Sequence, residues 1–213
     1  MRLVKVSSDG AFLAPTTRTR YTHTVHFLIS GIPASGKSTF SRWLEEKKGF
    51  LHLDVEKPNV LERCQLATAW HDLFDPGGSP APFLAALDKF KRPVVIDWGF
   101  PPEHIHAVCK LSDGGVMLWW FAADWAVARR KFKERGNRKG SVEAFDIQIR
   151  KIEAALTEIN ALFGSHVEYT LPSTGIYTPP DKIWKSMLDT LAGSRRRLGL
   201  PDPVHLHPSP DKK

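Results

Sequence analysis

The 213-residue sequence contains little cysteine and no long apolar run. Its two cysteines, Cys64 and Cys109, lie far apart and form neither a zinc-binding spacing nor a disulfide framework. No apolar run approaches the length of a membrane span, and the first 22 residues lack the apolar centre of a signal peptide. We therefore expect a cytoplasmic protein without disulfides and without a membrane partner.

The composition is that of a globular protein with a basic excess. Hydrophobic residues make up 42% and charged residues 25% of the chain, which suits one α/β domain around a single core. The formal net charge is +7, and part of it lies in the flanks of the chain. Two interpretations stay open for this charge: a globular domain with basic tails, or a surface that binds nucleic acid.

Short apolar segments alternate with helical patterns from residue 24 onward. We expect strands at 24–30, 50–54, 93–97, 116–121 and 166–171. We expect helices at 37–48, 58–74, 82–90, 125–135, 141–163 and 181–191. Continuously apolar strands that alternate with helices indicate a parallel sheet covered on both faces. Residues 1–22 are expected to be flexible or a small hairpin, 23–193 one domain, and 194–213 a disordered basic, proline-rich tail.

The first helix is preceded by a phosphate-binding motif. The segment Gly31-Ile-Pro-Ala-Ser-Gly36-Lys37-Ser38 fits G-x-x-x-x-G-K-[ST] without a mismatch. Backbone N–H groups of such a loop and the positive end of the helix dipole both favour phosphate. The residues expected to bind the nucleotide are Gly31, Pro33, Ala34, Ser35, Gly36, Lys37, Ser38 and Thr39. Lys37 would reach the β- and γ-phosphates, Ser38 would ligate Mg²⁺, and Thr39 would contact the α-phosphate.

Because this motif lies between an apolar strand and an amphipathic helix, the chain resembles the P-loop kinases over roughly residues 24–192. The resemblance is to the branch that includes adenylate kinase, gluconate kinase, polynucleotide kinase, chloramphenicol phosphotransferase and the zeta toxins. It implies a five-stranded parallel sheet in the order 2-3-1-4-5, with ATP and Mg²⁺ bound at the carboxyl ends of the strands. It also implies that 23–193 is a kinase domain with a lid around 129–141.

The resemblance implies roles for two aspartates, each of which is the last residue of a predicted strand. Asp97 lies in a segment similar to the Asp-Gly-Phe-Pro of adenylate kinases, with Trp98 as an extra residue, and would hold Mg²⁺ through water. Asp54 occupies the place where kinases acting on hydroxyl groups have an aspartate that takes the acceptor's proton, with Glu56 as second choice. For both aspartates a purely structural role in a turn stays open. Lys57 stands where polynucleotide kinases have an arginine.

Basic residues gather on the helix predicted at 125–135. Trp125, Ala128 and Phe132 would form its buried side, and Arg135 continues that side at the carboxyl end. An arginine facing inward needs an anion, so Arg135 is predicted as a lid residue that contacts the transferring phosphate, with Arg130 and Arg138 as further candidates.

The remaining candidates carry weaker signals. The histidines show no ligand spacing, and the strand at 118–121 is expected to be sheet core. We predict a kinase that uses ATP and Mg²⁺ to phosphorylate the hydroxyl group of a small acceptor, with Lys37, Asp54, Arg130, Arg135 and Arg138 as catalytic residues. Two alternatives stay open: a polynucleotide 5′-hydroxyl kinase, and a nucleotide-dependent switch or regulatory ATPase.

Overall fold

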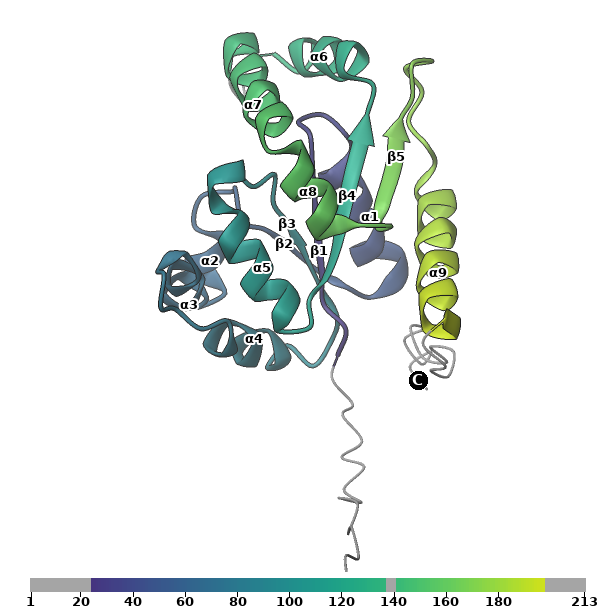
Figure 1. The fold of residues 1–213 in the computed structure, drawn as a ribbon. Coiled ribbons are helices and arrows are strands. Elements are labelled where there is room, and N and C mark those ends of the chain that lie inside the picture. Colours follow the sequence, from purple (N-terminus) through teal and green to yellow (C-terminus); the bar gives the residue numbers. More distant parts are fainter. Residues whose placement is uncertain (1–23, 137–140, 198–213) are drawn as a thin grey trace, which may run out of the picture.

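The computed structural model describes residues 24–136 and 141–197, which form a five-stranded parallel sheet in the order β2-β3-β1-β4-β5 (Figure 1). The strands are β1 (Phe27–Gly31), β2 (Leu51–Asp54), β3 (Val94–Asp97), β4 (Met117–Ala123) and β5 (Val167–Leu171). The predicted fold class and strand order are confirmed. As expected, β4 is sheet core, with its two tryptophans buried.

Helices cover both faces of the sheet. They are α1 (Lys37–Lys48), α2 (Val60–Arg63), α3 (Ala67–His71), α4 (Ala81–Asp88), α5 (Ile105–Asp113), α6 (Trp125–Glu134), α7 (Val142–Ala154), α8 (Leu156–Phe163) and α9 (Pro180–Arg197), with 3₁₀ turns at Asp72–Phe74 and Pro102–His104. No helix within 24–136 or 141–197 combines the length and apolar character needed to cross a bilayer.

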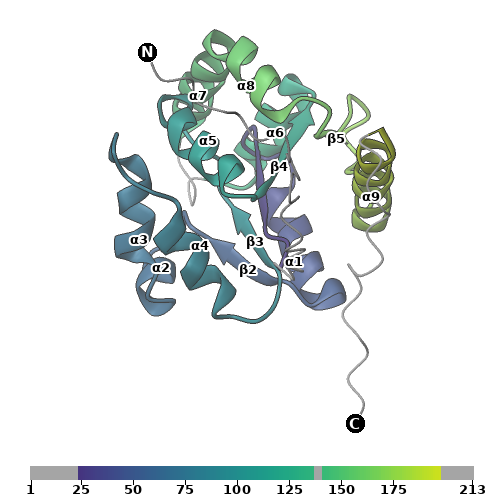
Figure 2. The same ribbon diagram turned by 60° about the horizontal axis from the view of Figure 1, so that its bottom comes forward.

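Each strand contributes to two separate cores because its side chains alternate between the faces. In β1, Phe27 and Ile29 pack with α1 and α9, while Leu28 packs with the helices of the opposite face. In Figure 1, α5 and α8 lie in front of the sheet and α1 behind it, and Figure 2 shows α2, α3 and α4 grouped beside β2 and β3. The strands are therefore buried on both faces, as their continuous apolar sequences predict.

The helices differ from the predicted ones at several places. The helix α5 was not predicted, although Ala107, Val108 and Leu111 form its buried side. The helix predicted at 58–74 is divided into α2, α3 and a 3₁₀ turn, with Gln65 in the left-handed region at φ 56° between α2 and α3. A residue in that region ends a helix, and the sequence shows no glycine there to signal it.

The carboxyl-terminal helices also differ. The single helix predicted at 141–163 is divided at Ala155, and Leu156, an apolar residue directly after the division, is 41% exposed. The last helix, α9, was expected to end at 191 but continues to Arg197, past the predicted boundary of the tail at 194. The predictions for residues 1–22 lie outside the described residues.

Candidate active site

The phosphate-binding motif forms the turn between β1 and α1. Gly31, at φ 139°, lies so close to β4 that a Cβ would overlap the carbonyl oxygen of Phe121. Gly36, at φ 94°, is the residue before the first turn of α1, and Ala34 adopts φ 62°. These positive φ angles curl the backbone between Gly31 and Gly36. The predicted nucleotide-binding residues therefore form one continuous segment, the loop and the first turn of α1, where phosphate binding is favoured.

Lys37 lies across this loop. Its Nζ donates hydrogen bonds to the carbonyl oxygens of Gly31 and Ile32, each at 3.0 Å. The side chain is largely buried, although it carries a charge. The ammonium group is thus held beside the loop, where it can interact with the terminal phosphates of a nucleotide bound there.

A tyrosine that the sequence did not indicate packs on the same loop. The hydroxyl group of Tyr177 donates to the carbonyl oxygen of Ala34 at 2.8 Å, and its ring would contact a Cβ at Gly36 at 3.3 Å. Arg135 donates from Nη2 to the same hydroxyl group at 3.1 Å. Since the tyrosine lies more than 140 positions from the motif, no local sequence pattern connects them.

A buried threonine adds a second contact from the same side. Thr170, near the end of β5, donates to the carbonyl oxygen of Ser35 at 2.6 Å. The loop is therefore fixed by side chains from two separate positions at and after β5.

The arginines differ from the prediction. The buried side of α6 is formed by Val127 and Ala128, whereas Trp125 is 37% exposed. Arg135 does not point inward: it is exposed and follows the last turn of α6. The end of the helix, where Arg135 lies, is exposed, although Ala128 and Phe132 contact the core as predicted. Arg135 nevertheless reaches Tyr177 above the loop.

The other two arginine candidates are less closely associated with the loop. Arg130 is exposed, and its Nη2 lies 3.2 Å from where a Cβ of Gly175 would be. Its Nε lies 3.9 Å from the Glu134 carboxylate, a distance at which exposed pairs contribute little. Arg138 lies outside the described residues. The structure therefore places Arg130 and Arg135 near the segment after β5.

The two predicted aspartates lie next to each other at the carboxyl ends of two adjacent strands. Asp54 pairs with Asp97 in the register of β2 with β3, and Asp97 pairs with Ile29 in the register of β3 with β1. Both aspartates are buried. Because β1 leads directly into the phosphate loop, Asp97 lies close enough to Lys37 to feel its charge, and Asp54 lies on the next strand beyond Asp97.

Asp97 is held as a carboxylate by its neighbours. Burial alone would raise its pKa, but hydrogen bonds with His52 and Ser38 and the positive charge of Lys37 lower the pKa below its ordinary value. His52 Nε2 lies 3.2 Å from Asp97 Oδ2. The contact with Ser38 shows that the two predicted Mg²⁺ residues lie together. A hydroxyl and a carboxylate oxygen suit Mg²⁺, so these residues fit that ion.

Asp54 has fewer partners than its burial would suggest. The Lys57 ammonium lies 3.3 Å from Asp54 Oδ2 without the alignment of a hydrogen bond, and no residue in the described part of the chain donates a hydrogen bond to Oδ2. Lys57 itself is 57% exposed. The Asp54 carboxylate therefore retains a free lone pair that can accept a proton.

Glu56, the second choice for this role, holds a loop instead. Its Oε1 accepts a hydrogen bond from the Gly99 amide at 3.1 Å, and Gln148 donates to the Gly99 carbonyl at 3.1 Å. Gln148 lies on α7, so the loop after β3 is tied both to the loop after β2 and to the helix that follows the predicted lid. Asp54 is thus better placed than Glu56 to contact an acceptor.

The aromatic residues of this region form core rather than the walls of a pocket. Trp70 packs against Phe83 and Trp98, with ring centroids 5.3 Å and 5.0 Å apart, and all three side chains are buried. Phe74 covers the cluster from outside.

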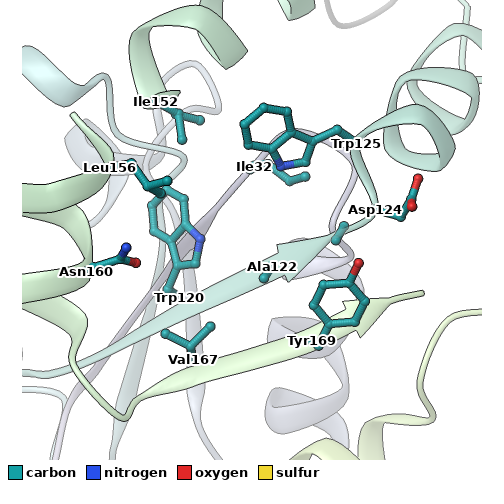
Figure 3. A pocket seen from close by; sticks show the side chains of 11 residues that line it. Ile32, Trp120, Ala122, Asp124, Trp125, Ile152, Leu156, Asn160, Val167 and Tyr169 are labelled. Atoms are coloured by element: carbon teal, nitrogen blue, oxygen red, sulfur yellow. The ribbon is translucent and has the colours of Figure 1, made fainter. Parts of the chain in front are cut away.

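A cavity of about 390 Å³ lies elsewhere, between the sheet and α7–α8 (Figure 3). Trp120, Val167 and Tyr169 line it from β4 and β5, and Ile152, Leu156 and Asn160 line it from the helices. Ile32 is its one residue from the phosphate loop. Lys37, Asp54 and Asp97 do not line it. This cavity is separate from the candidate active site.

No family model and no curated protein matches the sequence. Among solved structures, a sugar kinase from Janibacter sp. HTCC2649 matches with a TM-score of 0.51 and 13% identity, over 79% of this chain and 94% of that one. The chain has a P-loop kinase fold. A gluconokinase from Sinorhizobium meliloti 1021 has a TM-score of 0.48 at 14% identity, covering 83% and 96% of the two chains. A shikimate kinase from Aquifex aeolicus vf5 has a TM-score of 0.44 at 18% identity, and the match covers 81% of this chain and 99% of that one.

Proposed function

We propose that this P-loop kinase fold transfers the terminal phosphoryl group of ATP to the hydroxyl group of a small acceptor, with Mg²⁺ as cofactor. The observation that carries the proposal is the arrangement at the ends of three adjacent strands. The phosphate loop follows β1, Asp97 ends β3 and Asp54 ends β2, with Asp97 between the other two. A phosphate donor and a proton acceptor would thus lie together at the carboxyl ends of neighbouring strands.

The donor half would act by positioning and charge. The loop amides and Lys37 bind the phosphates, and Ser38 and Asp97 hold Mg²⁺, which supplies positive charge to the phosphate oxygens when bound. The lowered pKa of Asp97 supports this role, since only the carboxylate form can hold a cation. We assign Thr39 to the α-phosphate, as its position in the first turn of α1 allows.

The acceptor half would accept a proton. The acceptor oxygen forms a bond to the terminal phosphorus while the bond between that phosphorus and the bridging oxygen of ADP breaks. The hydroxyl proton passes to the Asp54 carboxylate, whose Oδ2 has no hydrogen-bond donor. A base in this position typically contributes about 10² to 10⁴ in rate.

Arg135 is assigned as the lid arginine. Its guanidinium is exposed, and its bond to the neutral Tyr177 hydroxyl can be exchanged for a stronger one to a phosphate oxygen. Arg130 and Arg138 are assigned supporting roles in the same lid.

The charges near Asp54 favour a neutral acceptor over a nucleoside monophosphate. Between residues 54 and 100 the only arginines are Arg63 and Arg92, both exposed. Arg63 donates from Nε to the carbonyl oxygen of Asn59, and Arg92 precedes β3 at the edge of the sheet away from the phosphate loop. Neither offers the fork that recognises an acceptor phosphate.

Measurement of ADP release from ATP, with and without a panel of hydroxyl compounds, tests the proposal. We expect one class of small hydroxyl compound to stimulate turnover, with little effect of salt on its binding. Turnover that stays slow whatever is added would indicate a switch. Efficient phosphorylation of AMP, CMP or UMP would contradict the neutral acceptor. A steep loss of acceptor binding with salt would favour a polynucleotide.

A further inference from the structure

One buried side chain of the site contacts Asp97 but is assigned no contact with nucleotide or acceptor. His52 lies on β2, two residues before Asp54, and its imidazole faces the edge of the sheet that carries both aspartates. One ligand atom from each of His52, Asp54 and Asp97 lies within 4.8 Å of the other two. The sequence offered no sign of this group, because Asp97 joins it only through the pairing of β2 with β3.

The distance between His52 and Asp97 suits direct coordination of a small dication by these two residues, and a ligand atom of Asp54 lies within 4.8 Å of both. Nitrogen and oxygen ligands bind zinc-like ions at about 2.0 to 2.2 Å, so two neighbouring ligands on one ion are about 3 to 3.5 Å apart. The 3.2 Å between His52 Nε2 and Asp97 Oδ2 falls in this range. An ion that replaces their hydrogen bond would require little movement of either side chain.

The three side chains are buried and lie on paired strands, unlike those of a surface cluster of acids. The side chains of His52, Asp54 and Asp97 are only 5%, 7% and 3% exposed. All three lie on paired strands, so their backbone positions are fixed by the sheet. Among the described residues Asp54 Oδ2 has no hydrogen-bond donor, and it lies 3.3 Å from the Lys57 ammonium.

The charge around the group is also suitable. Lys57, which offsets Asp54, is mostly exposed and can turn to solvent when a dication arrives. A buried pair of carboxylates is costly unless positive charge compensates it, and an ion held by both provides that charge.

We propose that His52, Asp54 and Asp97 form a binding site for a first-row transition-metal dication such as Co²⁺ or Zn²⁺. The site binds these ions in preference to Mg²⁺. Imidazole nitrogen suits these metals, whereas Mg²⁺ prefers oxygen and octahedral hydration. The site shares Asp97 with the proposed Mg²⁺ position and takes the Asp54 carboxylate. A transition metal bound here therefore excludes the use of Asp54 as a base, and it inhibits the proposed transfer.

Titration of the full-length protein with Co²⁺ in the absence of nucleotide tests this site, with visible absorption as the readout. We expect one equivalent of Co²⁺ to bind, with the visible d–d bands of a cobalt ion that has nitrogen and oxygen ligands. Millimolar Mg²⁺ should not displace it. His52→Gln should weaken Co²⁺ binding by at least about 10-fold, the lower bound seen when even an indirect partner of a metal ligand is lost.

A matched variant controls for the other histidines, of which the chain has nine in all. His71→Gln removes an exposed imidazole and should leave the high-affinity equivalent in place. Should His52→Gln fail to fold, Asp97→Asn and the Mg²⁺ competition on the unaltered protein decide the question. Co²⁺ binding no tighter than that of Mg²⁺, or unchanged in His52→Gln or Asp97→Asn, would overturn the proposal. None of these readouts depends on phosphoryl transfer, so failure of the kinase proposal would not affect them.

Discussion

The two halves of the candidate site are built in different ways. The donor half is organised by a backbone loop with positive φ at Gly31, Ala34 and Gly36, pressed against β4. The acceptor half is organised by a side chain at the end of β2, Asp54, which meets His52 and the proposed Mg²⁺ residue Asp97 of the paired strand β3. One half is therefore specified by a continuous motif, and the other by a strand register that no local motif records.

This difference implies different responses to mutation. Adding a side chain to the donor half should disturb the fold, because the backbone has no room for it. Changing a side chain of the acceptor half should leave the fold largely intact and alter chemistry or cation binding, because strand pairing does not depend on those groups. The predictions below test this contrast.

The largest effect on stability is expected for Gly31→Ala. The new Cβ would overlap the Phe121 carbonyl oxygen and would force an alanine to φ 139°. We expect a loss of more than about 4 kcal/mol in the free energy of unfolding, measured by urea denaturation. Gly77→Ala is the control: nothing lies within 4 Å of its added Cβ, so the change should stay within about 0.5 kcal/mol. A stable Gly31→Ala protein would show that the loop is less constrained than its contacts indicate.

Lys37→Ala should separate donor chemistry from donor fold. Loss of the ammonium group is expected to lower phosphoryl transfer by about 10² to 10³, while alanine maintains α1. Lys47→Ala, which alters an exposed lysine of the same helix, should have no effect on transfer. Comparable activity of the folded Lys37→Ala protein and the Lys47→Ala control would contradict the assignment of the loop.

A smaller effect is expected from Tyr177→Phe. The substitution removes the donor to the Ala34 carbonyl and the acceptor of the Arg135 hydrogen bond, while the ring stays against Gly36. We expect a loss of about 1 kcal/mol in the free energy of unfolding. Tyr169→Phe, at a 56% exposed position, serves as the control and should be neutral. Equal effects of the two substitutions would mean that the tyrosine does not support the loop.

The smallest effect concerns pH and lies outside both halves. Burial lowers the pKa of His166, against a partly opposing hydrogen bond with the Leu118 carbonyl. The unfolded chain then binds the proton more readily than the folded one, so acidification through about pH 6.5 should reduce stability. His166→Asn should flatten the dependence of the urea midpoint on pH without altering that of phosphoryl transfer. An unchanged profile would show that His166 does not contribute.

Much of the fold was predictable because its strands are continuously apolar and its glycines mark turns. The loop at Gly31–Ser38 and the positions of both aspartates at strand ends followed from sequence. The contact of His52 with Asp97 did not, since the two residues are 45 positions apart and the register of β2 with β3 fixes that contact. Tyr177 was missed for the same reason.

Helix faces were the least reliable part of the prediction. The buried side of α6 was predicted from Trp125, Ala128 and Phe132. Ala128 is buried and Phe132 packs against the core, but Val127 is buried in place of Trp125, which is partly exposed beside the cavity of Figure 3. Arg135 was predicted to face inward, yet it is exposed after the last turn of α6 and reaches the loop through Tyr177. A helix of only ten residues offers few turns from which to infer its buried side.

We propose that a donor half and an acceptor half of distinct function meet at the carboxyl ends of the strands. Asp54→Asn separates the two halves, by single-turnover transfer to the stimulating acceptor alongside titration with MgATP. We expect transfer to fall by about 10² to 10⁴ while MgATP affinity stays nearly unchanged, because the carboxylate is assigned to the acceptor and not to the donor. Loss of MgATP binding in Asp54→Asn, or full retention of transfer, would contradict the account.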